Sequence, residues 1–232
     1  YVLFSALQRF VSLKDVLGDF RIEFESDLVG AKSSATLSAL DIPERTSINN
    51  LDIVHVVDDR TIHSPLTVTH YKLDERKYSL PKNVVGLCAK FAIAEDITKR
   101  YLRSKSIENN AIQGFYHIIL VEGQLLDEGV NEQRDGFDKI SQENGNADLF
   151  DGIQISFEDI YAKLDDKVQE LLTPPDWSRD KIVSEVGQDF GVSEEMLSHS
   201  NTRVTFGDTP SSVAKRALKN LQDKVVDETA SI

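Results

Sequence analysis

The hydrophobic pattern of this chain changes its period once, near residue 141. Up to about residue 140, apolar residues alternate with polar ones or form short continuous runs, whereas beyond Ser156 they recur every three or four residues. The first pattern is typical of β-strands and the second of amphipathic α-helices. We therefore expect an α/β domain of the α+β type, a sheet covered by helices, over residues 1–145, followed by an all-α segment over residues 146–232.

Five segments of the first part have the composition of strands. Three of them alternate, and two are continuously apolar, as expected of central strands covered on both faces. Two further segments have helical spacing. The alternating strands are residues 20–24, 51–57 and 66–73; the central ones are residues 84–94 and 115–121; the helices are residues 1–13 and 96–104.

The second part contains three helical patterns behind a polar linker at residues 141–152. Ser156, with Asp159 three residues later, indicates a helix start, and Thr173 before two prolines indicates its end. A second helix is expected over residues 181–190, with Gly191 as its C-terminal stop. The last begins at Asp208 or Thr209, with Pro210 in its first turn.

The charge balance disfavours nucleic acid and anionic membranes as general partners. The 26 Lys and Arg residues against 39 Asp and Glu residues give a net charge of −13, which repels polyanions over most of the surface. One exception is the basic run at Lys99, Arg100, Arg103 and Lys105 around Tyr101 and Leu102. It is either a local phosphate contact or a solvated helix face.

Location and chain context are also constrained by the sequence. No stretch reaches the roughly 20 apolar residues that span a bilayer, so we expect no membrane partner. The single cysteine, Cys88, lies among apolar residues and is interpreted as a core residue, which fits a reducing cytoplasm. Because the chain opens on Tyr1 within a hydrophobic pattern, we expect it to belong to a longer polypeptide.

No motif supplies a complete active site. The chain lacks a G-x-x-x-x-G-K-[ST] loop, a G-x-G-x-x-G turn and a G-x-S-x-G elbow. His55, His63 and His70 lie on or between adjacent strand patterns, but no compact set of metal ligands accompanies them. We interpret these histidines as strand residues that face solvent or bond to neighbours, and predict no metal site.

The polar turn after residues 115–121 carries the best candidate chemistry. Arg134 supplies a permanent positive charge with several donors, which suits phosphate oxygens, and Asn131 is a residue that fixes turns with its own side chain. The alternative is a helix beginning near Val130, with Arg134 paired to Asp127, Asp138 or another surface carboxylate. The residues alone leave both readings open.

The segment LLDEGVNEQRDGF resembles a pattern in ATP-binding proteins of the GHKL superfamily, which includes the ninety-kilodalton heat-shock chaperone. A bacterial group of that superfamily has a pattern like F-L-D-x-x-V-N-x-E-R-x-x-F, and Gln133 departs from it where the pattern has Glu. Upstream, Cys88 and Ala89 match a second strand motif, so the resemblance covers about residues 80–137. The matching positions are Leu126, Asp127, Val130, Asn131, Arg134 and Phe137.

The resemblance implies a transducer or middle domain, followed by a helical segment that relays nucleotide state or dimerises. In that superfamily an upstream domain holds ATP and magnesium, and the transducer supplies a basic residue to the γ-phosphate. By this comparison Arg134 is the catalytic residue that contacts the terminal phosphate, and Asn131 shapes the loop that aims it. The chain alone is then not an enzyme, although its parent is an ATP hydrolase and a homodimer.

A different class of function stays open. The acidic helical tail could dock a partner protein or pair with itself through faces such as Phe157, Leu164 and Leu171, which would make the chain a non-enzymatic interaction module. The client and the biological process are not indicated by the sequence, because one fold serves many functions.

Overall fold

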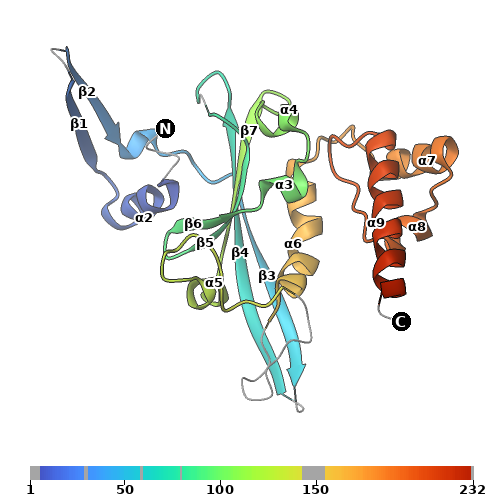
Figure 1. The fold of residues 1–232 in the computed structure, drawn as a ribbon. Helices are drawn as coiled ribbons and strands as arrows, with labels where there is room; N and C mark the ends of the chain where they lie inside the picture. The colour runs from blue at the N-terminus through green and yellow to red at the C-terminus, as the bar shows by residue number, and fades with distance from the viewer. Residues whose placement is uncertain (1–5, 29–30, 58–59, 79, 143–154, 231–232) are drawn as a thin grey trace.

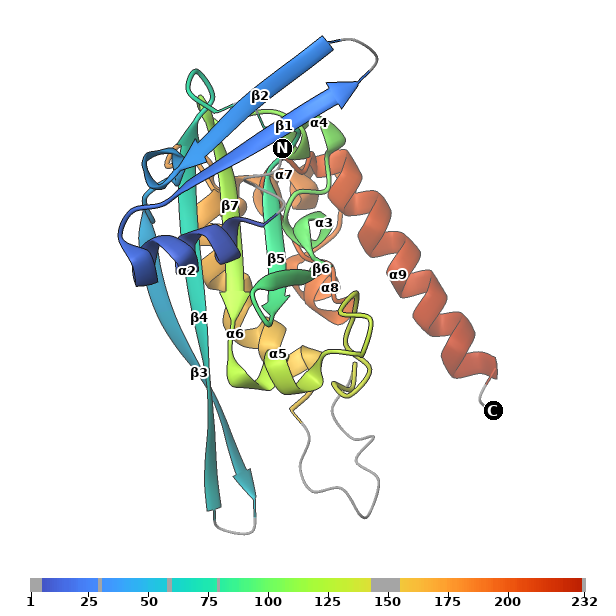
Figure 2. The same ribbon diagram turned by 90° about the vertical axis from the view of Figure 1, so that its left-hand side faces the viewer.

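The computed structural model describes residues 6–28, 31–57, 60–78, 80–142 and 155–230 (Figure 1). It contains a five-stranded sheet, a separate two-stranded hairpin and helices that cover the larger sheet, with a helical region at the C-terminal end (Figures 1 and 2). The predicted fold class is confirmed. In chain order the elements are α2 (Leu7–Leu17), β1 (Arg21–Leu28), β2 (Ala31–Ser38), η1 (Ala39–Asp41), β3 (Ser47–Val57), β4 (Arg60–Asp74), β5 (Val84–Ala89), β6 (Ala92–Asp96), α3 (Thr98–Tyr101), α4 (Lys105–Glu108), β7 (Phe115–Glu122), α5 (Gln124–Gly129), α6 (Phe157–Leu172), α7 (Arg179–Phe190), α8 (Glu194–His199) and α9 (Pro210–Ala230).

The large sheet has the strand order β3-β4-β7-β5-β6. Its neighbouring strands are antiparallel except for β5 and β7, which run in parallel. A parallel pair needs a crossover connection, and the short helices α3 and α4 lie within the connection from β6 to β7. The carboxyl ends of β5 and β7 therefore meet at the same edge of the sheet.

The two faces of the sheet are covered by different elements. One face packs against α6, whose Ile160, Leu164 and Val168 are fully buried. The other face packs against α2 and the base of the hairpin, through Leu7 and Val11. Figure 1 shows α2 and α6 on opposite sides of the sheet. Because side chains alternate between faces, the central strand β7 buries both, which explains its continuous apolar sequence.

Several predicted elements have different boundaries in the structure. The apolar run at residues 84–94 is two strands, because Lys90 and Phe91 both adopt a positive φ and form a tight turn between β5 and β6. The helix expected at residues 96–104 is only the single turn α3. The N-terminal helix is Leu7–Leu17, and residues 1–5 of the predicted helix lie outside the described residues.

The predicted helix starts of the tail are supported by capping contacts. The Ser156 hydroxyl accepts from the Asp159 amide, and the Asp159 carboxylate accepts from the Ser156 amide. Gly191 ends α7 in the left-handed conformation, with φ of 67°. At α9 the cap is Thr209, whose Oγ1 accepts from the Ser212 amide at 3.3 Å. α8 was not predicted, although Ser193 caps it by the same chemistry.

The packing divides the tail after α6. Helix α6 contributes to the core of the sheet, whereas α7, α8 and α9 share a separate core that includes Val186, Leu197 and Val213. The chain therefore passes from the core of the sheet to the core of the C-terminal helices after Leu172. The domain boundary expected at residue 145 stays a prediction. Phe157 and Leu164 are buried against the sheet and Leu171 packs against the same core, so the docking face suggested for them is not available.

We predict that Leu164→Ala lowers the free energy of unfolding by about 2–5 kcal/mol, because it opens a cavity where α6 meets the sheet. Urea unfolding measures this change. The matched control is Lys163→Ala, an exposed neighbour on the same helix, which should change stability by less than about 0.5 kcal/mol. Equal effects of the two substitutions would show that α6 is not part of the sheet's core.

Candidate functional site

The predicted site residues lie in a loop that both of its ends hold against the core. β7 leads into α5, and the chain then crosses from Val130 to Phe137, which form an isolated antiparallel bridge. Val130 is buried and Phe137 is half-buried against Ala89, Ala94 and Val130. Between these anchors, Glu132 to Asp135 are exposed. The loop therefore projects a short polar tip from a fixed base.

Asn131 organises the tip through its backbone and its side chain. Its amide donates to the Gly136 carbonyl at 3.0 Å, which closes the loop. Its Oδ1 accepts from the Asp135 amide at 3.1 Å, and its Nδ2 donates to Asp135 Oδ1 at 2.9 Å. These contacts match the prediction that Asn131 fixes the turn with its own side chain.

Arg134 stands at the exposed part of this loop. It has a φ of 61°, a left-handed conformation that residues other than glycine adopt infrequently, and its amide donates to the Asn131 carbonyl at 3.2 Å. Within the described residues, its guanidinium forms no ion pair and no hydrogen bond. The alternative of a helix from Val130 with Arg134 paired to a carboxylate is not observed, because α5 ends at Gly129.

The loop lies at the carboxyl edge of the parallel strands. α5 and the loop follow the end of β7, and the turn at Lys90 follows the end of β5. The two connections are joined, because the Lys90 amide donates to Asp127 Oδ1 at 2.6 Å. Arg134 therefore lies beyond the carboxyl ends of the parallel strands β5 and β7.

The other candidate residues have structural roles. His70 and His117 are buried and stacked, with 3.0 Å between His70 Nε2 and His117 Nδ1, and burial lowers the pKa of His70 to about 4. His63 pairs with Asp52 on the neighbouring strand. The His55 side chain lies outside the described residues. No cluster of three or more His, Cys, Asp or Glu side chains suited to a metal occurs in the described part of the chain.

Cys88 is buried at 1% exposure, as predicted, and burial raises the pKa of its thiol.

The residues of the basic run have different roles. Arg100 makes a two-bond contact with Asp165 on α6, and Tyr101 and Leu102 are buried, while Lys99, Arg103 and Lys105 are exposed. Only part of this run is therefore a solvated face.

A polar junction around Asp165 was missed by the sequence reasoning. Asp165 accepts from Arg100 and from the Tyr101 hydroxyl, and Arg203, from the loop before α9, lies 3.0 Å from its Oδ1. The carboxylate thus joins α3, α6 and the C-terminal helices. The sequence shows Asp165 only as one of several acidic residues on the polar side of α6. Nothing in that pattern distinguishes Asp165 from its exposed neighbour Asp166.

Comparisons with known proteins give no further identification. No family model, no curated protein and no solved structure matches this chain. In the part of the chain that the structure describes, no helix has the length and apolar character needed to cross a membrane.

We predict that Asn131→Ala frees the tip of the loop. Removing its two contacts with Asp135 should lower the free energy of unfolding by only about 1 kcal/mol, because the loop is exposed. The Asp135 amide should exchange its hydrogen faster, since it loses its acceptor. Hydrogen exchange measures this locally, with Glu132→Ala as the control on the same loop, and unchanged exchange at Asp135 would exclude the aiming role of Asn131.

The buried histidine pair predicts a loss of stability in acid. Burial, and then the charge of His70, lower the pKa of His117 to about 3, so both rings are neutral in the folded protein at neutral pH. The unfolded chain takes up these protons below about pH 6.5. Stability is therefore complete above that pH and falls as the pH decreases toward 4, by up to about 1.4 kcal/mol per pH unit for each histidine.

Urea unfolding between pH 7.5 and 4.5 tests this expectation. His70→Gln should flatten the pH dependence relative to the unsubstituted chain, whereas His199→Gln, at an exposed position without an ion pair among the described residues, should leave it unchanged. The same slope in all three proteins would mean that other groups cause the loss of stability in acid.

Proposed function

We propose that this chain is the transducer segment of a GHKL-type ATPase. In this proposal Arg134 contacts the γ-phosphate of ATP that an upstream domain of the same polypeptide holds together with magnesium. The supporting observation is the geometry of the loop, in which an exposed arginine without a partner among the described residues stands on a base fixed by Val130, Asn131 and Phe137. A free guanidinium on a fixed base suits an anion presented from outside the chain.

The residues present fit a phosphate contact but not a complete nucleotide site. Arg134 offers a planar set of donors that matches phosphate oxygens, and within the described residues no carboxylate competes for it. The nucleotide and its metal would have to come from elsewhere, and the bound metal would neutralise charge on the phosphates. The chain by itself is therefore not expected to hydrolyse ATP.

Arg134 would act by stabilising the negative charge that develops on the phosphoryl group. An arginine that completes such a site can contribute about 10³–10⁵ in rate, or roughly 4–7 kcal/mol at 1.36 kcal/mol per tenfold. Pre-organisation is part of this contribution, because a loop ordered before ligand binding loses less entropy when it binds. The contacts of Asn131 would serve that purpose.

The same loop is connected to the C-terminal helices by packed side chains. The Phe137 ring lies edge-on to Phe157, the first residue of α6, with 5.8 Å between ring centroids. Two turns later on α6, Asp165 lies 3.0 Å from Arg203 of the loop before α9. Contacting side chains thus connect the Arg134 loop to the C-terminal helices. In this proposal, movement of the loop on ATP binding or hydrolysis is transmitted along these contacts and shifts the equilibrium between two arrangements of the domains.

A second candidate function is self-association through α9. Leu218, Val225 and Val226 are more than half exposed on this helix. Leu218 and Val225 are two turns apart and share one side of it, which favours a second helix as a partner. This function and the first are compatible, because a dimerising tail can follow a transducer domain.

We predict that Arg134→Ala in the full-length protein lowers the turnover of ATP at least tenfold and changes nucleotide affinity by less than about threefold. The reason is that Arg134 would act on the transition state, while the upstream domain supplies most ground-state binding. Steady-state ATPase assays and nucleotide titration measure the two quantities separately.

The matched control is Glu132→Ala, an exposed residue of the same loop, which should keep normal turnover. Arg134→Lys should recover only part of the activity, because lysine keeps the charge without the planar fork. Normal turnover of Arg134→Ala would remove this residue from the mechanism.

A further inference from the structure

Four arginines gather where the α3–α4 segment meets the loop before α9. Arg100 and Arg103 come from the α3–α4 segment, Arg203 comes from the loop before α9, and Arg216 lies on α9 itself. Arg100 and Arg203 share the carboxylate of Asp165, with nitrogen–oxygen distances of 2.6 and 3.0 Å. A common carboxylate therefore holds these two guanidiniums close together.

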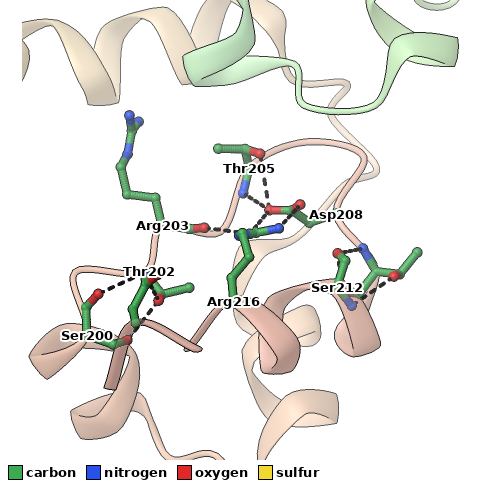
Figure 3. A network of polar contacts seen from close by, with 9 residues as sticks. Ser200, Thr202, Arg203, Thr205, Asp208, Ser212 and Arg216 are labelled. Carbon is green, nitrogen blue, oxygen red and sulfur yellow. Dashed lines mark hydrogen bonds and ion pairs between the residues drawn. The ribbon is translucent and has the colours of Figure 1, made fainter. Parts of the chain in front are cut away.

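Arg216, on α9, is held in place by Asp208 and by the backbone of Arg203. Its Nη1 and Nη2 donate to the two oxygens of Asp208, at 2.9 and 2.7 Å, and Nη2 also donates to the Arg203 carbonyl. Figure 3 shows Arg216 lying against Asp208, while Arg203 points away from that pair. The Asp208 side chain is 3% exposed, so this ion pair is an internal support.

The two elements touch directly next to Arg103. Gly207 has a φ of 86°, and a Cβ at that position would lie 2.0 Å from Ile107 Cδ1. Glycine allows this approach without displacing the end of the Ile107 side chain, and it adopts this positive φ without strain. Ile107 is four residues from Arg103, so this contact joins the segment that carries Arg103 to the loop between Arg203 and Arg216.

Arg103 is the unpaired member of this group. It is exposed, and among the described residues no carboxylate lies within ion-pair distance of it. Partial loss of hydration at its guanidinium and the positive charges of Arg216, Arg203 and Arg100 lower the pKa of Arg103, whereas the negative charge of Asp208 raises it. The two carboxylates that contact arginines of the junction, Asp165 and Asp208, are already engaged by the other three arginines.

We infer that this junction, in which Arg103 has no ion-pair partner among the described residues, is a binding site for a phosphate group. A phosphate carries up to two negative charges and several acceptor oxygens, which matches an excess of guanidinium donors better than a single carboxylate does. The site lies at the end of the sheet opposite Arg134, because α3 follows β6 and the Arg134 loop follows β7. It is therefore separate from the proposed phosphate contact of Arg134, although Asp165 and Arg203 also belong to the route proposed between the Arg134 loop and the tail.

Two sources of phosphate fit this chemistry, a small phosphate compound and the backbone of a nucleic acid. The net charge of −13 opposes a long polyanion, but a short strand can contact one local basic site. Sodium pyrophosphate and a 12-nucleotide single-stranded oligonucleotide are the two probes. Calorimetric titration and fluorescence anisotropy of the 232-residue chain at low ionic strength measure their binding.

The expected result is binding of at least one probe, weakened tenfold or more by Arg103→Ala and largely restored by Arg103→Lys. Arg76→Ala is the matched control, because Arg76 is an exposed arginine that pairs with Asp74 at the end of β4, and it should bind as the unsubstituted chain does. Thermal unfolding within about 2 °C of the unsubstituted chain verifies that Arg103→Ala is folded, as expected for an exposed side chain without an ion pair.

The two probes distinguish the sources. Binding of pyrophosphate alone assigns the site to small phosphate compounds, and binding of the oligonucleotide, with an affinity that falls steeply with salt, assigns it to nucleic acid. Absence of binding by both probes at millimolar concentration would overturn the inference. The same conclusion follows if Arg103→Ala and Arg76→Ala weaken binding equally.

Discussion

The packing of α6 against the five-stranded sheet is the interaction on which the rest of this molecule depends. The helix covers one face of the sheet with Ile160, Leu164 and Val168. Its first residue, Phe157, contacts the Phe137 ring at the base of the Arg134 loop. The polar flank of the same helix carries Asp165, which lies 3.0 Å from Arg203 of the loop before α9. One helix thus connects the core, the candidate site and the C-terminal helices.

The two groups of arginines differ in what surrounds them. Arg134 has no ion-pair partner among the described residues and lies at the carboxyl edge of β5 and β7, on a loop that Asn131 holds in place. Carboxylates anchor Arg100, Arg203 and Arg216, whereas Arg103 has no carboxylate partner in the part of the chain that the structure describes. An isolated charge on a fixed loop suits a contact completed by another domain, whereas an excess of charge at one junction suits a ligand of its own.

The spacing of apolar residues predicted the fold class and most helices and strands. This was possible because the spacing that gives a strand or a helix one buried face is visible within a short stretch of sequence. Ser156 and Gly191 were identified correctly since caps also depend on local chemistry. The turn at Lys90 and Phe91 was not found, because it uses positive φ without glycine. The role of α6 in the sheet's core and the contacts of Asp165 depend on tertiary packing between residues distant in sequence, which no local pattern contains. The Asn131 turn was predictable from its residue type, but it was not predictable that no carboxylate of the described residues pairs with Arg134.

The most direct test of the proposed function is a structure of the full-length protein with magnesium and a non-hydrolysable ATP analogue. The proposal predicts that an Arg134 nitrogen lies within about 3 Å of a γ-phosphate oxygen, with the Asn131 to Asp135 contacts unchanged. A γ-phosphate contacted by other cations, with Arg134 directed into solvent, would contradict it.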